Sequence, residues 1–186
     1  MVRDYVKFLP KDAEFNDFLT EFQNESERAA AVLGAAYLDD LLKQLLEGFL
    51  VNDEAALKEL LSDMNALGTY AVRAKVAYAA GIIAKDERDD LAQIGAIRNK
   101  FAHRKEALSF EEPPVSAHCG NFTLVKERFA AEPKLAKVYP RSNRGMYNLE
   151  VALLAYYLTR RLSHVQRVSL LEPALWKRYD LPGESR

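Results

Sequence analysis

The side chains best suited to chemistry in this 186-residue chain lie close together, at Arg98, Asn99 and His103. A histidine can carry a proton at neutral pH, and an arginine can stabilise the negative charge of a phosphate group. Together they could cleave RNA without a metal ion, because the histidine can take the proton of a ribose 2′-hydroxyl. These three residues are therefore the motif of functional interest.

The spacing of these residues favours a structural interpretation over a catalytic one. Five residues turn a regular helix by about 140°, so Arg98 and His103 do not share one helical face. Arg98 is one helical turn from Ile94 and Ala102, where its guanidinium could border the core and bind carbonyl or acidic groups. His103 could cap the end of the helix, where the dipole favours a cation. We therefore assign no catalytic residue, and catalysis stays an alternative.

The remaining candidate sites are weaker. Cys119 is the only cysteine, and the histidines at positions 103, 118 and 164 lack the spacing of metal ligands, so no metal is expected. The chain has neither a phosphate-binding loop nor a Gly-x-Ser-x-Gly motif, and no cofactor is expected. Paired carboxylates occur where solvated helix faces or turns would place them, at Asp39–Asp40, Asp89–Asp90 and Glu111–Glu112.

Nothing in the sequence predicts direct, sequence-specific DNA binding. A helix-turn-helix needs a buried aliphatic residue after its small residue and glycine, but Asp40 follows Ala30 and Gly34, and Glu87 follows Ala77 and Gly81. The net charge is −1, without the basic excess that duplex binding usually requires. A basic face near the helix ends would be the remaining route, and a solvated charged face is the better interpretation of its candidates: Lys100, Arg104, Lys105, Arg141, Arg144, Arg160 and Arg161.

Apolar residues recur at helical spacing through most of the chain. The strongest pattern has apolar pairs every four positions from Tyr37 to Leu50, which excludes a strand and predicts a helix over about 25–50. Asn24 is expected to cap this helix, with Glu27 reaching back to it. The apolar pairs are too many for a thin bundle to bury, so we also expect a two-fold homodimer.

Further helices are predicted over residues 11–22, 53–64, 70–84, 86–103 and 145–168. Asn52 or Asp53 should cap the 53–64 helix, which points Leu57, Leu60 and Leu61 inward, and Asp86 should cap the 86–103 helix. The looser region 107–143 should hold one or two short helices. The chain is thus expected to be all-α, a single-domain bundle of about six to eight helices over residues 1–172 with a weakly structured tail at 173–186.

The sequence also indicates a cytoplasmic protein. A single cysteine cannot form an internal disulfide, which fits a reducing compartment. The first residues lack the apolar run and cleavage site of a signal peptide. The apolar stretches are too short to span a bilayer, so no membrane contact is expected.

Two resemblances follow from these segments. Residues 97–103 have the Arg-polar-x-x-x-His form of HEPN domains, which implies RNA cleavage where the arginine and histidine of two protomers meet. Residues 27–42, 67–83, 97–113 and 141–161 together resemble the mannitol-operon repressor family in order and spacing. That resemblance implies an all-helical fold without a recognised DNA-binding motif, and repression of sugar-alcohol uptake genes.

Three functions are therefore open. The favoured one is a transcription regulator of the mannitol-operon repressor type, which acts through contact with another regulatory protein. The alternative is a HEPN-like, metal-independent ribonuclease, toxin-like or an inactive relic, with Arg98, Asn99 and His103 as its site and RNA as its partner. The third is direct DNA binding through the basic face.

Overall fold

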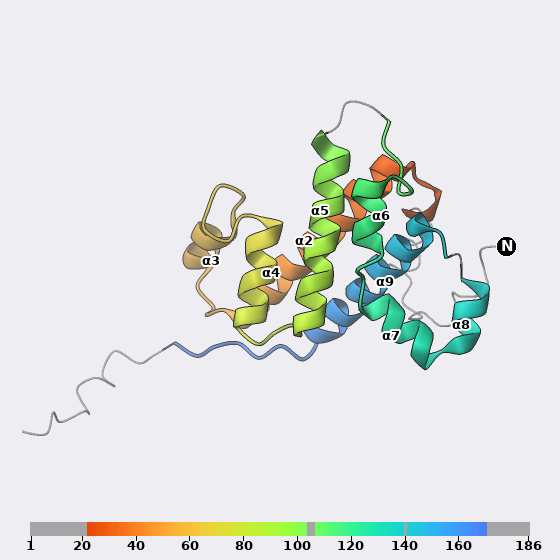
Figure 1. The fold of residues 1–186 in the computed structure, drawn as a ribbon. Helices are drawn as coiled ribbons and strands as arrows, with labels where there is room; N and C mark the ends of the chain where they lie inside the picture. The colour runs from red at the N-terminus through yellow and green to blue at the C-terminus, as the bar shows by residue number, and fades with distance from the viewer. Residues whose placement is uncertain (1–21, 104–106, 140, 171–186) are drawn as a thin grey trace, which may run out of the picture.

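The described part of the chain is entirely helical, which confirms the predicted all-α fold. A computed structural model describes residues 22–103, 107–139 and 141–170. The helix expected over 11–22 and the tail expected at 173–186 lie almost wholly outside these residues. Within the described ranges the helices, labelled as in Figure 1, are α2 (Glu27–Phe49), α3 (Glu54–Leu61), α4 (Tyr70–Ala79), α5 (Lys85–His103), α6 (Pro113–Cys119), α7 (Leu124–Ala131), α8 (Pro133–Val138) and α9 (Asn143–Leu162).

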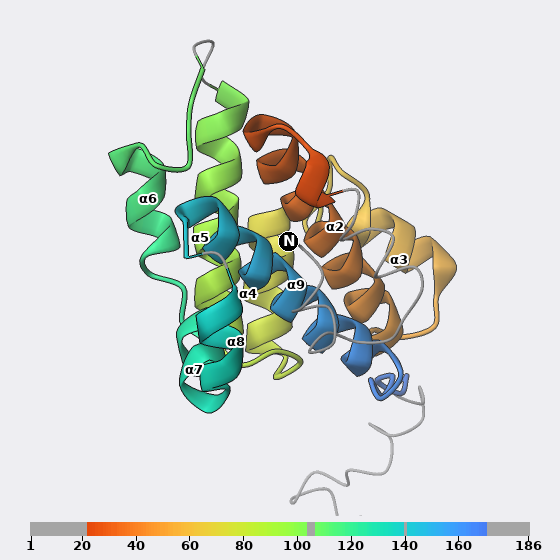
Figure 2. The ribbon, with the colours of Figure 1, turned by 90° about the vertical axis from the view of Figure 1, so that its right-hand side faces the viewer.

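Helix α2 lies at the centre of the bundle and packs against α9, α5 and α4 (Figures 1 and 2). Helix α5 has α4 on one side and α6 on the other, and α7 packs against α9. Helix α3 lies beyond α4, at the end of the molecule away from α6 and α8 (Figure 1). This arrangement leaves α5 between two neighbours with its outer face open to solvent, which matters for the site described below.

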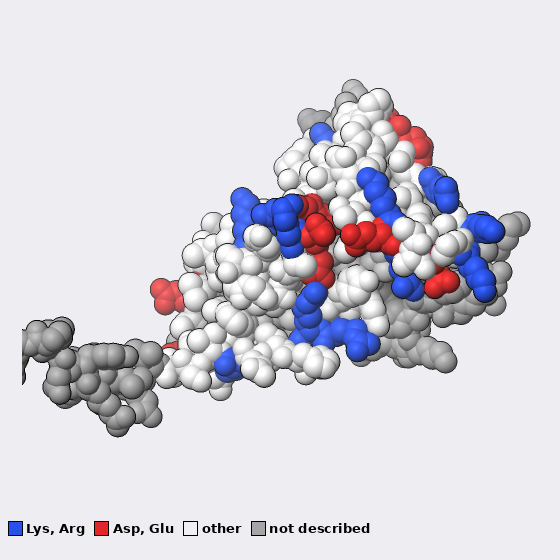
Figure 3. All heavy atoms as spheres, turned by 60° about the horizontal axis from the view of Figure 1, so that its bottom comes forward, with Lys and Arg blue, Asp and Glu red and all other residues white. Residues whose placement is uncertain are grey.

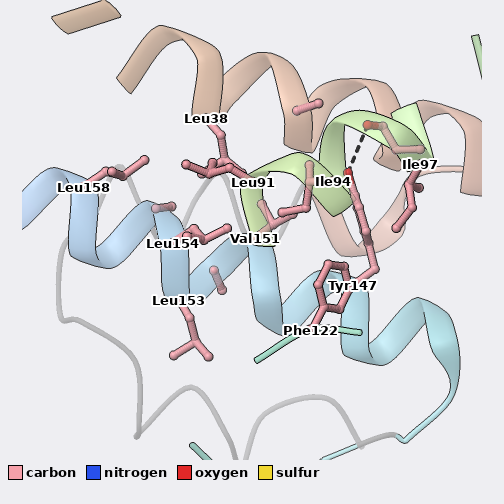
Figure 4. Packing of buried hydrophobic residues seen from close by; sticks show 14 of the residues in the cluster. Leu38, Leu91, Ile94, Ile97, Phe122, Tyr147, Val151, Leu153, Leu154 and Leu158 are labelled. Atoms are coloured by element: carbon pink, nitrogen blue, oxygen red, sulfur yellow. Dashed lines mark hydrogen bonds between the residues drawn. The ribbon is translucent and has the colours of Figure 1, made fainter. Parts of the chain in front are cut away.

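The core forms where α2, α5 and α9 meet. Leu38, Leu91, Ile94 and Leu154 come together there with no exposed surface (Figure 4). At one end the buried Tyr147 hydroxyl donates a hydrogen bond to the carbonyl oxygen of Ala31 at 3.0 Å, which ties α9 to α2. Truncating a buried leucine here to alanine should cost about 2–5 kcal/mol, because the cavity cannot refill.

The residue predicted to cap the start of α2, Asn24, was wrong by two positions. Ser26 caps the helix, and its side-chain oxygen accepts a hydrogen bond from the Ala29 amide at 3.2 Å. Ser26 has the extended backbone that a capping residue needs, immediately before the first helical residue. The Glu27 carboxylate accepts the Phe110 amide at 3.1 Å, which connects the first turn of α2 to the segment before α6.

The apolar pairs of α2 are buried within a single chain. Leu41, Leu42, Leu45 and Leu46 are at most 5% exposed, because α9, α5 and α4 cover the helix from several directions. The bundle is therefore not thin around α2, contrary to the expectation from the sequence. The expectation of a homodimer therefore loses the support that it drew from this helix.

The next two helices end earlier than predicted. Asp53 caps α3 as expected, but the helix stops at Leu61, and Leu60 lies 37% exposed rather than inward. Thr69 caps α4, which stops at Ala79 rather than residue 84. Gly81 ends α4 by adopting a left-handed backbone with φ of 72°, which allows the Ile82 amide to bond the Ala77 carbonyl.

Helix α5 begins at Lys85, so Asp86 lies in its first turn and is not its cap. The Glu87 carboxylate instead accepts the Ala84 amide at 2.7 Å and binds Arg161 of α9 at 2.5 Å. In the region 107–143 the structure has three short helices rather than one or two. Pro113 and Pro133 start two of them, because a proline at the first helical position loses no hydrogen bond.

Helix α9 is capped by Ser142 and stops at Leu162 rather than residue 168. The chain then crosses the end of α2, where the Val168 amide donates to the Phe49 carbonyl at 2.7 Å. Arg167 also donates to the Leu50 carbonyl at 3.1 Å. These two bonds use carbonyl groups that the end of a helix leaves unpaired.

Candidate functional site

The sequence motif lies on the last turns of α5. Leu91, Ile94, Ile97 and Phe101 form the buried stripe of this helix and fix its orientation. Arg98 follows Ile97 and is half-buried, whereas Asn99 and His103 are exposed. His103 is the last residue of the helix, so the expectation that it closes α5 is confirmed.

Two surface hollows flank this part of α5, and they separate the motif residues. The first, here called the α4–α5 groove, has a volume of about 690 Å³ and includes Arg98 and Asn99 in its lining. The second, here called the α5–α6 hollow, has a volume of about 480 Å³ and includes Asn99 and His103. Within one chain, Asn99 is thus shared, but Arg98 and His103 face different spaces. This agrees with the 140° turn expected from their spacing.

Arg98 does not make the contacts that the structural interpretation gave it. Its guanidinium forms no hydrogen bond or ion pair with another described residue. The arginine that fulfils that role is Arg73 on α4, which is 3% exposed. Arg73 binds the Asp39 carboxylate at 2.8 Å and donates to the carbonyl oxygens of Leu61 and Leu67 at 2.9 Å each.

The α4–α5 groove combines an apolar floor with charged edges. Small residues line it from both helices, and Tyr70 closes its base with its hydroxyl bonded to the Leu91 carbonyl at 2.8 Å. Arg88 and Asp89 pair with each other at one edge, and Arg88 also lies 4.6 Å from the centre of the Tyr78 ring. The small lining residues are Ala71, Ala74, Ala92, Gly95 and Ala96.

The α5–α6 hollow has a polar lining. His118 of α6 lines this hollow, and its Nδ1 lies 2.7 Å from the side-chain oxygen of Gln93. Because that oxygen can only accept, the hydrogen of a neutral His118 ring is assigned to Nδ1, and Nε2 then bears none. Burial and the nearby Lys100 ammonium lower the pKa of His118, which favours the neutral ring. Nothing in the sequence pointed to His118 as a neighbour of His103, because the two lie on different helices.

The residues suggested for a basic face are engaged within the chain or dispersed. Arg144 is half-buried and donates to Asn148 and to the Phe22 and Glu25 carbonyls, and it lies 5.5 Å from the centre of the Phe110 ring. Arg141 donates to the Ala136 carbonyl at 3.2 Å. Arg104 and Lys105 lie outside the described residues. Figure 3 shows basic and acidic side chains interspersed on the face that it displays.

Arg160 and Arg161 are engaged too. The Arg160 guanidinium donates to the Tyr156 hydroxyl at 3.1 Å, and Arg161 pairs with the buried Glu87. Lys100 lines the α5–α6 hollow instead of joining these arginines. Among the candidates within the described ranges, the structure therefore does not bring Lys100 together with these arginines.

Two buried carboxyl groups were missed by the sequence reasoning, which placed Asp90 on a solvated face. Asp90 is 1% exposed and accepts the amides of Thr123 and Leu124, and Glu150 is 0% exposed and accepts the Val125 amide. Burial and the charge of Asp90 raise the pKa of Glu150 well above its usual value. One usable signal was present, since Glu150 is the acid within an otherwise apolar run of α9.

Neither metal ligation nor a membrane span is indicated by the described residues. Among them, no group of three or more histidine, cysteine or acidic side chains is placed to hold a metal ion. Cys119 is buried, and burial raises the pKa of its thiol to about 12. None of the helices in the described ranges is both long enough and apolar enough to cross a membrane.

Comparison with known proteins gives a consistent result. The family model described as mannitol repressor matches residues 15–168. A chain in the X-ray structure of the MtlR–HPr complex from Escherichia coli is similar with a TM-score of 0.62 and 19% identity, covering 80% of this chain and 99% of that one. The crystal structure of a possible transcriptional regulator, YggD, from Shigella flexneri 2a strain 2457T gives a TM-score of 0.61 and 17% identity, covering 83% and 99%. The comparison with curated proteins gave no match.

Proposed function

Since this chain belongs to the mannitol repressor family, we propose that it regulates transcription through contact with another protein rather than by reading DNA itself. Its role as a regulator follows from the family. The contact with a partner is our proposal, and an HPr-type protein is the partner that we propose, because the similar E. coli chain comes from a complex of MtlR with HPr.

The observation that carries this proposal is the α4–α5 groove. It is larger than the α5–α6 hollow, small apolar residues line it from both helices, and Lys75 and Arg98 line it without an ion pair to a described residue. An apolar floor with charged edges resembles the core and rim of a protein interface. A partner helix with small apolar residues and flanking acidic side chains is complementary to it.

Isothermal titration calorimetry tests the contact between this chain and purified HPr from the organism that encodes the chain. Wild-type protein should bind, and Ala92→Glu should weaken binding at least tenfold, because a carboxylate would be forced into the apolar floor. Ala92 is already exposed, so the substitution should leave the melting temperature nearly unchanged. Ala130→Glu on the exposed face of α7 is the matched control and should bind as the wild type does. Absence of binding, or equal loss in both variants, would count against the groove.

The cytoplasmic location and the homodimer belong to the same proposal. Transcription takes place in the cytoplasm of a bacterium, which is where a regulator of this family would act. Val32 and Leu33 on α2 are 38% and 43% exposed, and they give a second copy a small apolar surface to cover. Light scattering at micromolar concentration should give twice the mass of one chain, and a mass of one chain would reject the dimer.

A further inference from the structure

The α5–α6 hollow gathers hydrogen-bond donors and positive charge in one place. The Asn99 amide, the Lys100 ammonium and the imidazoles of His103 and His118 all line it, and its other lining residues are apolar. No carboxylate occurs among the described residues that line it. Lys100 forms no ion pair with a described residue, so its charge has no partner within the described chain.

These four side chains come from two helices whose relative positions are fixed by packing. On the α5 side, Asn99 and His103 are four residues apart and share one helical face. On the α6 side, the hydrogen bond between His118 and Gln93 fixes the imidazole. Phe101 of α5 and Val115 of α6 are fully buried, so both helices that line the hollow are anchored in the core.

We propose that the α5–α6 hollow binds the phosphate group of a phosphate monoester. The ammonium brings three N–H donors and the amide two, and His118 adds its Nε2 hydrogen once the ring is protonated, because its Nδ1 hydrogen is already bonded to Gln93. Several donors suit an anion with several oxygens. The volume of about 480 Å³ lies within the range of small-molecule sites and exceeds what a phosphate alone fills. The apolar walls are available to contact the organic group that carries the phosphate.

This site is separate from the partner contact proposed above. It lies on the other side of α5 from the α4–α5 groove, and Ala96 and Asn99 are the residues common to both linings. Ala92→Glu should therefore leave phosphate binding unchanged. Failure of the partner contact and failure of phosphate binding can be told apart, because the two experiments use different ligands and different variants.

The three histidines of the chain provide the direct test. Their C2 protons are followed by NMR while pH is varied, in 20 mM inorganic phosphate and in chloride of equal ionic strength. A bound dianion should raise the pKa of His118 by about 0.5–1 unit, because a nearby opposite charge favours the protonated ring, and it should move the C2 proton resonance of His103. His164 lies at the far end of α9, away from the hollow, and should not change. No difference between the buffers, or an equal change at all three histidines, would overturn the site.

A pair of lysine variants tests the same site by affinity. Lys100→Gln should weaken phosphate binding about tenfold and remove the response of His118. Lys126→Gln on the exposed surface of α7 removes the same charge elsewhere and should have no effect. Equal weakening by both variants would mean non-specific attraction and would reject the proposal.

Two sources of the phosphate group can then be distinguished. Tighter binding of a hexitol phosphate than of inorganic phosphate would identify a small effector. Tighter binding of a phosphoserine peptide would identify a phosphate carried by a protein. Both results support the site, whereas binding of neither compound nor of inorganic phosphate at 20 mM would reject it.

Discussion

Glu150 of α9 and Asp90 of α5 bring two buried carboxyl groups together at the start of α7. Between them they accept the amides of Thr123, Leu124 and Val125, so they cap this helix with side chains from two other helices. The nearby charged groups that act on the pair, Asp86 and Glu127, are also acidic, and the Glu150 Oε1 is buried without a hydrogen-bond partner among the described residues. Burial and the charge of Asp90 raise the pKa of Glu150, so Glu150 is the member of the pair that favours the protonated form.

The proton on Glu150 predicts how stability depends on pH. In the unfolded chain Glu150 ionises near 4.5, and in the folded chain its pKa is raised. Its contribution to stability is therefore complete below about pH 4.5 and is lost as pH rises toward the folded pKa, by up to about 1.4 kcal/mol per pH unit. Glu150→Gln should flatten that decline, because an amide keeps a donor and cannot ionise.

Urea unfolding of the wild type and Glu150→Gln between about pH 5.5 and 8.5 measures this difference. Glu59→Gln on α3 is the matched control, since Glu59 is exposed and lies outside the group of charges that act on the pair, so the slope of the wild type should be unchanged. If the free energy of unfolding depends on pH in the same way in the wild type and in Glu150→Gln, then Glu150 does not keep its proton in the folded chain.

The two arginines at α4 and α5 should differ in their effect on stability. Arg73→Ala removes a buried guanidinium from the partly buried Asp39 carboxylate and from two carbonyl groups, and it should cost about 3–5 kcal/mol because these groups lose their partner. Arg98→Ala removes no such contact and should cost less than about 1 kcal/mol. Denaturant unfolding of both variants makes the comparison, and a larger loss in Arg98→Ala would reverse the assignment.

Cleavage of RNA is not expected from the isolated chain. Arg98 and His103 line different hollows, so one chain cannot place both on the same phosphodiester. We expect single-stranded RNA to stay intact during incubation with wild-type protein in the presence of EDTA. Cleavage that disappears in both Arg98→Ala and His103→Ala, with unchanged melting curves, would establish the ribonuclease function and require a partner chain.

Binding to duplex DNA should be weak and independent of sequence. The net charge is −1, and the arginines at positions 144, 160 and 161 are already engaged within the chain. Few phosphates can then be neutralised, so affinity at physiological salt should stay no tighter than about 10⁻⁶ M. A gel shift with the promoter of the neighbouring genes measures it, and a nanomolar, sequence-dependent complex would restore the basic face as a hypothesis.

Periodicity was sufficient to predict the longer helices, because burial of one face dictates the spacing of apolar residues. The ends of those helices depend on single contacts, such as the left-handed Gly81 and the Ser26 cap, and adjacent residues of similar type compete for each role. The candidate site was harder to predict from the sequence, because it depends on contacts between different helices. Asp90 looks like any acid on a helix surface until α7 is placed above it, and His118 becomes a neighbour of His103 only when α6 packs on α5.

The central position of α2 has a consequence for the order of events during synthesis. The Tyr147 hydroxyl binds the Ala31 carbonyl across 116 residues of sequence. At about 5–20 residues per second, a ribosome needs roughly 6–23 s to make the 116 residues between these two positions. Throughout that time the face of α2 that α9 will cover is exposed to other nascent chains. Helices α4 and α5 emerge first and can cover part of it, so the yield of folded protein should depend on how soon they pack.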